Sequence, residues 1–324
     1  MYRSKIAGVG SFLPEKILSN HDLEKMVETS HEWIVQRTGI ERRHIIADDE
    51  GTSDMCVRAA RRALEDANLS IDQIDMICVA TLSGDYKMPA TACLVQSKLG
   101  AKNVMSFDLN AACSGFIYSL HIADQFVRTG VYKNVLVIGA ENLTRMLNYK
   151  DRETCILFGD GAGAFVLQRT EKTDPNHIMT SLAHAEGSLY DLLWASGGGT
   201  RHPLSQKVLD EGSQYMIMKG KEIFKNATRA MAACCNEALA DTPFVLGKEN
   251  DSFCRSHGSV VVARDLRPAL ALGRVGRSRR GSPKSWSAGG RQSCGSDWCL
   301  RVAEYPAGTF QLSLSEGTPA ECPD

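Results

Sequence analysis

Residues 107–120, FDLNAACSGFIYSL, place Cys113 where a strand is expected to turn into a helix. A thiol at the start of a helix faces unpaired backbone N–H groups and the positive end of the helix dipole, and both favour the thiolate. The neighbouring residues are small, which allows a sharp turn and leaves room for a substrate carbonyl beside the sulfur: Ala111, Ala112, Ser114 and Gly115. Cys113 is therefore a candidate nucleophile, and the alternative is a buried cysteine that fills a small gap.

Other residues that could take part in catalysis or ligand binding give weaker signals of function. The glycine-rich segment FGDGAGAF (158–165) has no lysine-serine or lysine-threonine pair after it, so we interpret it as a tight turn between two strands rather than a phosphate-binding loop. His121 follows Cys113 by two helical turns, roughly 12 Å along the axis, which is too far to pair with the sulfur. His184 and His202 lie in loop-like segments and are interpreted as surface or structural histidines.

Apolar runs suited to buried strands alternate with segments of helical periodicity. The predicted strands are DMICVAT (75–81), VMSFDL (104–109) and NVLVIGA (134–140). The predicted helices are residues 53–69 with Ser53 or Asp54 near the cap, residues 89–100, residues 114–130 with Gly130 as the stop, and residues 213–241, a long and mostly buried helix interrupted near Gly220. This alternation predicts an α/β fold with a mostly parallel sheet flanked by helices.

The composition of the 324 residues indicates a soluble protein, with 43% hydrophobic residues, 23% charged residues and a net charge of −1. Near-zero charge argues against general nucleic-acid binding. No apolar run approaches the ~18 residues of a membrane helix, and the N-terminus lacks the apolar core of a secretory signal, so a cytoplasmic location is expected. Seven of the 11 cysteines are scattered through residues 1–240 without metal-ligand spacing, and most are interpreted as core thiols.

The composition changes after about residue 240. The C-terminal segment (residues 241–324) contains no isoleucine and no methionine, holds six of the ten prolines, and has nine arginines but only two lysines. Residues 273–297 have no periodicity and are rich in glycine, serine and arginine, which indicates loop or disorder. A flexible extension is one interpretation. We favour the other, in which a frameshift or a fusion has replaced the native C-terminal portion.

Several motifs up to residue 240 are distinctive together. They are DLNAACSGF (108–116), GVGSFLPEKILSNHDLEKMVETSHEWIVQRTGI (8–40), MPATACLVQSKLG (88–100), DRETCILFGDGAGAFVL (151–167), HAEGS (184–188) and MKGKEIFKNA (218–227). These segments resemble the condensing enzymes of the thiolase superfamily, specifically beta-ketoacyl-acyl-carrier-protein synthase III. The resemblance covers about residues 1–240.

The resemblance implies a duplicated thiolase-like α/β fold with mixed sheets layered with helices and an incomplete second half. It implies an N-terminal half over residues 1–170 that carries the nucleophile, the start of a C-terminal half over residues 171–240, and an atypical segment over residues 241–324. A homodimer is implied as well. In the implied reaction, acetyl or another short acyl group passes from coenzyme A to Cys113 and then condenses with malonyl-acyl-carrier protein. Acyl-CoA is a substrate here, so no cofactor is expected.

The resemblance also assigns binding residues. Trp33 and Arg152 match residues that sandwich the adenine of coenzyme A, and Arg37 matches one that contacts its phosphate region. An indole offers a stacking face and a guanidinium can stack or bind phosphate, which agrees with these roles. Met88 matches an acyl-pocket residue contributed across the dimer interface, where a flexible thioether can shape the acyl-chain limit. Phe224 is assigned to the same substrate pocket.

The expected partners of the nucleophile are missing from the sequence. The family supplies a histidine and an asparagine in segments resembling Pro-His-Gln-Ala-Asn and Gly-Asn-Thr-Ser, and neither segment occurs here. His257 and Asn250 are the only residues of their types in the C-terminal segment, and their neighbourhoods do not match. A condensation-defective acyl-binding relic is therefore the alternative to a working synthase. A related polyketide, alkylquinolone or hydroxymethylglutaryl-CoA synthase is a third hypothesis.

Overall fold

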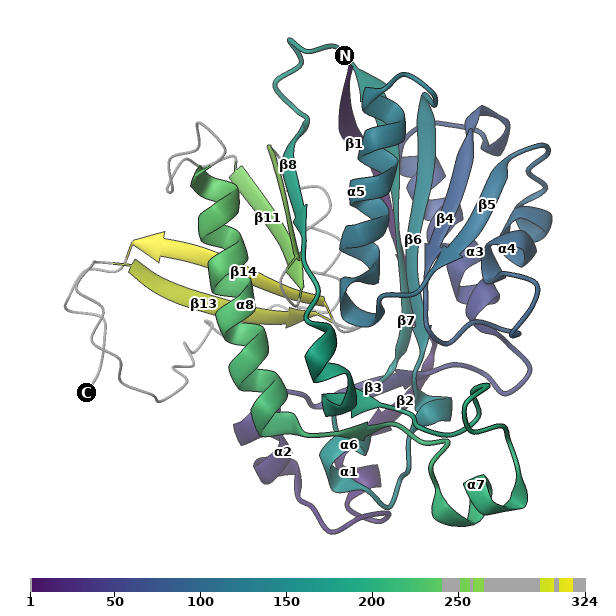
Figure 1. Cartoon of the computed structure of the whole chain (residues 1–324), viewed down its shortest axis with the longest axis vertical. Helices are drawn as coiled ribbons and strands as arrows, with labels where there is room; N and C mark the ends of the chain where they lie inside the picture. Colours follow the sequence, from purple (N-terminus) through teal and green to yellow (C-terminus); the bar gives the residue numbers. More distant parts are fainter. Residues whose placement is uncertain (1, 241–250, 257–258, 265–297, 306–308, 317–324) are drawn as a thin grey trace.

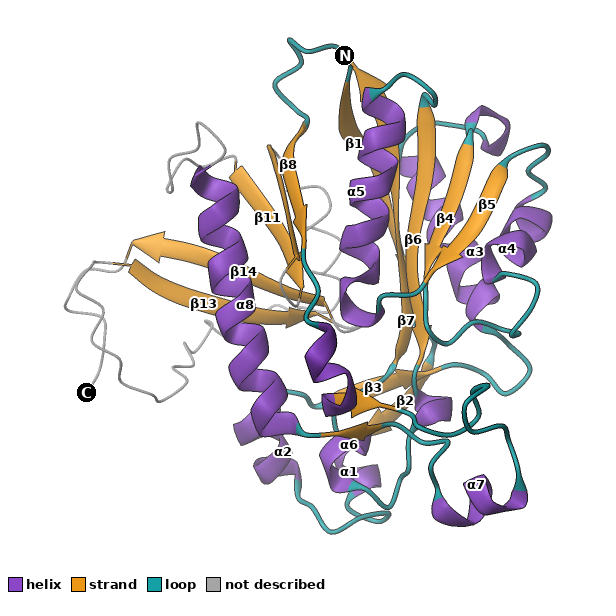
Figure 2. Cartoon of the chain, viewed as in Figure 1, coloured by secondary structure: helices purple, strands orange, loops and turns teal. Residues whose placement is uncertain are grey.

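The computed structural model describes residues 2–240 together with four strands at 251–256, 259–264, 298–305 and 309–316. Two five-stranded sheets and the helices that pack on them form layers, with the first sheet on the right and the second sheet on the left of Figure 2. The first sheet has the strand order β1-β7-β6-β4-β5. Its strands are β1 (Arg3–Phe12), β4 (Met76–Ala80), β5 (Met105–Leu109), β6 (Asn134–Asn142) and β7 (Asp160–Thr170). The three strands predicted from the apolar runs are confirmed.

The first sheet is mixed rather than mostly parallel. β4 runs parallel to β5 and to β6, but β7 is antiparallel to both β6 and β1. Parallel strands need a long crossover, usually a helix. Residues 143–159, between β6 and β7, contain only the short turns η3 (Thr144–Met146) and α6 (Arg152–Cys155), so β7 returns beside β6 in the opposite direction. The prediction of a mostly parallel sheet is wrong in this respect, and the mixed sheet implied by the resemblance is confirmed.

Most of the glycine-rich segment 158–165 belongs to a strand and not to a turn, since residues 160–165 lie in β7 and residues 158–159 precede it. β7 begins at Asp160, and Gly161, Ala162 and Gly163 pair with the end of β6. A Cβ atom added at Gly163 would meet nothing within 4 Å, so this glycine marks open space beside the strand rather than a bend. The predicted tight turn is therefore wrong.

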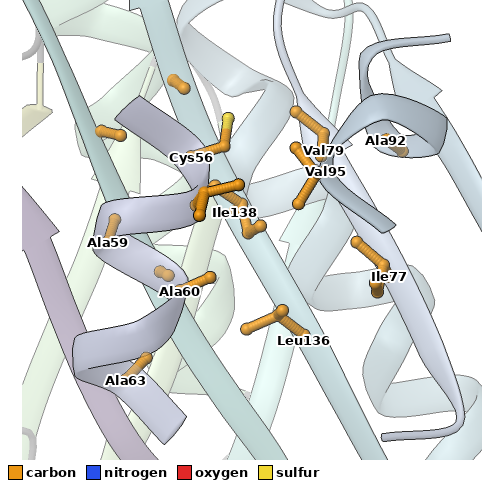
Figure 3. Close-up of a cluster of buried hydrophobic side chains, with 14 of the residues drawn as sticks. Cys56, Ala59, Ala60, Ala63, Ile77, Val79, Ala92, Val95, Leu136 and Ile138 are labelled. Carbon is orange, nitrogen blue, oxygen red and sulfur yellow. The ribbon is translucent and has the colours of Figure 1, made fainter. Parts of the chain in front are cut away.

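Helices cover both faces of the first sheet. α3 (Thr52–Asp66) and α4 (Thr91–Leu99) pack on one face, and α5 (Gly115–Arg128) packs on the other, in front of the sheet in Figure 1. Side chains alternate along β4: Ile77 and Val79 join the cluster under α3 and α4, whereas Met76 and Cys78 join the cluster under α5. Figure 3 shows the first cluster. Each fully buried large aliphatic side chain contributes about 1.5–3 kcal/mol.

The helix ends agree with their capping residues. The helix predicted at residue 53 begins at Thr52 with Gly51 as its N-cap, because the Asp54 carboxylate accepts a hydrogen bond from the Gly51 N–H at 2.9 Å. The expected cap at Ser53 or Asp54 is thus displaced toward the N-terminus. Gly100 and Gly130 adopt positive φ angles of 78° and 84° after α4 and α5, as their predicted roles as helix stops require.

The second sheet has the order β13-β14-β11-β12-β8. Its strands are β8 (Ile178–Ala183), β11 (Asp251–Ser256), β12 (Ser259–Arg264), β13 (Trp298–Tyr305) and β14 (Thr309–Glu316). β12 pairs antiparallel with both β8 and β11, so the C-terminal segment contributes four of the five strands. Figure 1 shows α8 (Gly220–Ala240) beside this sheet.

The helix predicted at residues 213–241 is shorter and more exposed than expected. It begins at Gly220, because the preceding residues form β10 (Ile217–Met218), which pairs with β9 (Leu193–Trp194). Only Cys234 and Ala238 of α8 are buried, against side chains of β8. The prediction of a mostly buried helix is therefore wrong.

A third group of elements lies at the lower edge of Figure 1. It comprises β2 (Lys16–Ser19), β3 (Arg42–Ile45), α1 (Asn20–Leu23), α2 (His31–Thr38) and α6. Leu23, Ile34, Cys155 and Ile156 form its small core. α7 (Gln206–Glu211), η1 (Ile71–Gln73) and η4 (Gly187–Leu192) complete the described helical elements. No described helix is both long enough and apolar enough to cross a membrane.

Candidate active site

Cys113 lies at a tight turn between β5 and α5. β5 ends at Leu109, the turn η2 (Ala112–Ser114) follows, and α5 starts at Gly115. Ala112 has a φ of +47°, a left-handed conformation that is uncommon for a residue with a Cβ atom. Backbone strain of this kind concentrates at functional sites, where the surrounding structure enforces it. The predicted strand-to-helix turn around the thiol is confirmed.

The small residues of this turn allow close packing on the sheet. A Cβ atom at Gly115 would lie 3.3 Å from the Ala80 Cβ, at the end of β4. A Cβ atom at Gly139 on β6 would lie 3.0 Å from the Phe116 ring. The start of α5 therefore sits directly on the carboxyl ends of β4 and β6, where open α/β sheets bind ligands.

The ionisation of Cys113 differs from the prediction. Burial raises the pKa of the Cys113 thiol above its usual value, the negative charge of Glu141 raises it further, and a hydrogen bond from its own backbone N–H opposes both. We expected the helix start to favour the thiolate. Burial is the largest influence on the pKa of this thiol, because a charged sulfur is poorly solvated there.

Glu141 is a buried acid that the sequence prediction missed. Its carboxylate accepts hydrogen bonds from the Leu82 N–H at 3.1 Å, from the Thr81 hydroxyl at 3.4 Å and from the Ser83 hydroxyl. Burial raises the pKa of Glu141 to about 7, although these hydrogen bonds lower it. The available signal was an acid directly after the apolar run 134–140, at the carboxyl end of a buried strand.

The structure brings the three predicted coenzyme A residues together. The guanidinium carbons of Arg37 and Arg152 lie 4.5 Å and 4.7 Å from the centroid of the Trp33 ring. Arg152 also donates a hydrogen bond to the Glu28 carbonyl at 3.1 Å. Trp33 and Arg37 lie on α2, and Arg152 is the first residue of α6, so the small core between these helices sets their positions.

The two predicted pocket residues are exposed. Met88 and Phe224 expose 83% and 72% of their surface, on the segment before α4 and on the first turns of α8 respectively. Neither residue is shown in contact with Cys113. Their assignment to a substrate pocket stays a prediction.

The histidines near the site have structural partners. The Nδ1 of His121 lies 2.7 Å from the Ser181 hydroxyl, and the Nε2 of His184 lies 3.0 Å from the Glu237 carboxylate. Within residues 2–240 and the four later strands, no group of three or more His, Cys, Asp or Glu side chains could hold a metal ion. His257 and Asn250 lie outside the described residues.

Comparisons with known proteins agree on one family. The family described as 3-Oxoacyl-[acyl-carrier-protein (ACP)] synthase III matches residues 107–187, which include Cys113 and Glu141. The beta-ketoacyl-[acyl-carrier-protein] synthase III of Sulfurovum sp. (strain NBC37-1) is 45% identical over 283 residues, which cover 85% of this chain and 83% of that protein. The synthase III of Caldanaerobacter subterraneus subsp. tengcongensis is 51% identical over 234 residues, covering 72% of this chain and 70% of that protein.

Solved structures give the same result. The 3-oxoacyl-[acyl-carrier-protein] synthase III of Aquifex aeolicus VF5 is similar with a TM-score of 0.67 and 47% identity, covering 74% of this chain and 71% of that one. A priming beta-ketosynthase of the R1128 polyketide pathway is 33% identical with a TM-score of 0.68, covering 75% and 71% of the two chains.

Proposed function

The chain belongs to the beta-ketoacyl-[acyl-carrier-protein] synthase III family, and from that premise we propose that it condenses a short acyl-CoA with malonyl-acyl-carrier protein to start fatty acid synthesis. The observation that carries the proposal is Cys113, held at the tight β5-to-α5 turn inside the segment that matches the family. The polyketide, alkylquinolone and hydroxymethylglutaryl-CoA synthase alternatives are not favoured, because the relatives named above at 45–51% identity are beta-ketoacyl-[acyl-carrier-protein] synthases III, whereas the polyketide priming synthase is 33% identical.

The proposed reaction has two steps. The Cys113 sulfur attacks the carbonyl carbon of acetyl-CoA or another short acyl-CoA, the bond from that carbon to the coenzyme A sulfur breaks, and coenzyme A leaves with the thiol proton. Malonyl-acyl-carrier protein then loses carbon dioxide, and its carbanion attacks the acyl carbon and releases the Cys113 thiolate. The product is a beta-ketoacyl-acyl-carrier protein. Neither step as written requires a cofactor.

In the proposed complex Trp33 and Arg152 hold the adenine of coenzyme A, and Arg37 contacts its phosphate region. Aromatic and guanidinium planes that already lie against each other support this assignment, since both can stack on a nucleobase. Because Arg152 now rests on the indole, the nucleobase has to displace it.

The second step depends on donors that stabilise the enolate. Such donors contribute about 3–4 kcal/mol each when they are preorganised. The sequence has no segment like Pro-His-Gln-Ala-Asn or Gly-Asn-Thr-Ser after residue 240. This absence is the specific observation in favour of the second candidate function, an acyl-binding protein that accepts the acyl group on Cys113 but does not condense it.

We also propose a homodimer that acts in the cytoplasm. β5 is an edge strand of the first sheet, and no described strand pairs with its outer side. Tyr86 and Met88 are exposed on the segment between β4 and α4. An open strand edge beside exposed apolar side chains is a suitable surface for a second copy. In the proposed dimer Met88 reaches the acyl pocket of the partner, and Phe224 lines the pocket of its own chain.

The test follows both steps on one sample. The purified chain is incubated with acetyl-CoA, the mass of the peptide that contains Cys113 is measured, and carbon dioxide release is measured after malonyl-acyl-carrier protein is added. Acylation with carbon dioxide release is the expected result. Acylation alone supports the acyl-binding alternative, and no acylation overturns both. Cys113→Ser should abolish the mass shift, while Cys93→Ser, at another half-buried thiol, should leave it unchanged.

A further inference from the structure

Acidic side chains stand at the carboxyl ends of three neighbouring strands. Asp108 is on β5, Asp85 follows β4, and Glu141 is on β6. The Asp108 carboxylate accepts hydrogen bonds of 2.6 Å and 2.7 Å from two backbone N–H groups at the start of α4. The Asp85 carboxylate accepts a hydrogen bond of 2.8 Å from a backbone N–H group in the first turn of α3. These two acids therefore cap helices, which is a sufficient structural reason for each. Glu141 caps no helix.

The hydrogen bonds that Glu141 accepts from described residues all come from one turn. Thr81, Leu82 and Ser83, which follow β4, donate to its carboxylate. The Ser83 hydroxyl in turn accepts a hydrogen bond from the Asn142 N–H at 2.7 Å. The turn after β4 is thus fastened to the end of β6 by the Glu141 side chain.

The same turn touches the segment that carries the nucleophile. The Thr81 N–H donates to the Leu109 carbonyl at 3.1 Å, at the last residue of β5. Ala80, one residue before this turn, lies against Gly115 at the start of α5. Glu141 is therefore tied to both sides of the β5-to-α5 turn, and its charge acts on the thiol in the middle of it.

We propose that Glu141 is a positioning residue for Cys113, which fastens the turn of residues 81–83 beside the thiol and, when ionised, holds that thiol in its protonated form. A negative charge near a thiol in a poorly hydrated site opposes formation of the thiolate. Protonation of Glu141 removes this opposition. The ionisation of the nucleophile is thereby coupled to a second group within the neutral range, since the pKa of Glu141 is about 7.

Among the described residues, the charge of Glu141 acts on two thiols. Its negative charge raises the pKa of Cys113, in the turn before α5, and that of Cys56 on α3. Asp85 and Asp108 act on Cys56, and neither is among the causes of the Cys113 shift. Across the part of the chain that the structure describes, no lysine, arginine or histidine forms an ion pair with Glu141. Protonation is thus the available way to remove its charge.

The inference deepens the proposed function and rests on it only for its catalytic consequence. If Cys113 accepts the acyl group, Glu141 limits the supply of thiolate until acyl-CoA is bound. The coupling itself is measured without any substrate, so a failure of the proposed function and a failure of this inference give different results.

The experiment measures the rate at which iodoacetamide alkylates Cys113 in the full chain, from about pH 6 to pH 10, by peptide mass. In the wild type the logarithm of the rate should rise with unit slope at low pH, rise less steeply as Glu141 ionises near neutral pH, and then follow a parallel line that is displaced downward; this displacement is the step. Glu141→Gln should follow the upper line without the step, so that its Cys113 is alkylated roughly threefold or more faster than that of the wild type at pH 8.

Asp108→Asn is the matched control, because it removes a neighbouring strand-end carboxylate that does not act on Cys113. It should keep the wild-type step. Three results would each overturn the proposal. The first is a wild-type plot of the logarithm of the alkylation rate against pH that is straight through neutral pH. The others are a step that is still present in Glu141→Gln and a step that is lost in Asp108→Asn. Cys56 and Cys155 are fully buried, so their lack of reaction in the same spectra shows that a variant is folded; the wild-type profile decides the question without any variant.

Discussion

The Arg152 guanidinium lies on the indole of Trp33, with its central carbon 4.7 Å from the ring centroid. Carbon atoms in contact are separated by about 3.5–4 Å, so a nucleobase between the two groups needs roughly 7 Å. The space for adenine is therefore closed by the pair that is proposed to bind it. Binding of coenzyme A then requires Arg152 to exchange one stacking partner for another.

We expect Trp33→Ala to weaken the use of acetyl-CoA. Stacking of this kind contributes about 0.5–1.5 kcal/mol, so the KM for acetyl-CoA in the acylation of Cys113 should rise roughly three- to tenfold. Trp33→Phe keeps a stacking face, so its KM for acetyl-CoA should lie between those of the wild type and of Trp33→Ala. The KM for acetyl-pantetheine, which lacks adenine, should be the same in all three proteins. An equal rise with acetyl-pantetheine would mean that Trp33 acts through the fold and not through the nucleobase.

A second prediction concerns the contact between β1 and α3. A Cβ atom at Gly10 would clash with the Ala59 carbonyl oxygen and lie 2.9 Å from the Arg62 Cβ, whereas one at Gly163 would meet nothing within 4 Å. Gly10→Ala should therefore lower the free energy of unfolding by about 1–3 kcal/mol or more. Gly163→Ala is the matched control in a paired strand of the same sheet and should stay within about 0.5 kcal/mol. Urea unfolding measures both, and equal losses would contradict the close packing of α3 on β1.

A third prediction concerns the core shown in Figure 3. Ile138 on β6 is fully buried between α3 and the sheet, and Val131 is 60% exposed. Ile138→Ala should lower the free energy of unfolding by about 2–5 kcal/mol, because it removes buried methyl groups and leaves a cavity. Val131→Ala should change it by less than about 0.5 kcal/mol. A small effect at Ile138 would show that the sheet does not form the stable part of the molecule.

The sequence predicted the parts of the fold that depend on local patterns. Buried parallel strands are nearly continuous apolar runs, which is why β4 and β6 could be identified. The run at β5 was also found, although its residues are half-buried or exposed. Gly130 follows α5 with a positive φ angle, and glycine adopts that conformation without strain. Cys113 could be found for the same reason, because its strand, its turn and its helix are consecutive in the chain.

The remaining features depend on residues that are distant in the sequence. Glu141 acts through a turn that begins at Thr81, and Arg152 rests on Trp33 from another element. β7 contains glycines that alone indicate a turn, and only pairing with β1 and β6 makes them a strand. Local propensity carries no information on such pairings.

The buried carboxylate also predicts how stability depends on pH. The pKa of Glu141 is raised from 4.5 to about 7 in the folded protein, so between these values the folded state binds a proton that the unfolded state has lost. Stability must then fall as pH rises through this range and level off above about pH 7. The full shift corresponds to roughly 3 kcal/mol. The glutamine side chain introduced in Glu141→Gln has no proton to lose. The free energy of unfolding of this variant, relative to that of the wild type, should therefore increase between about pH 5 and pH 8. Urea unfolding at several pH values measures this difference, and parallel curves for the two proteins would show that Glu141 is ionised at an ordinary pKa and that its burial is compensated.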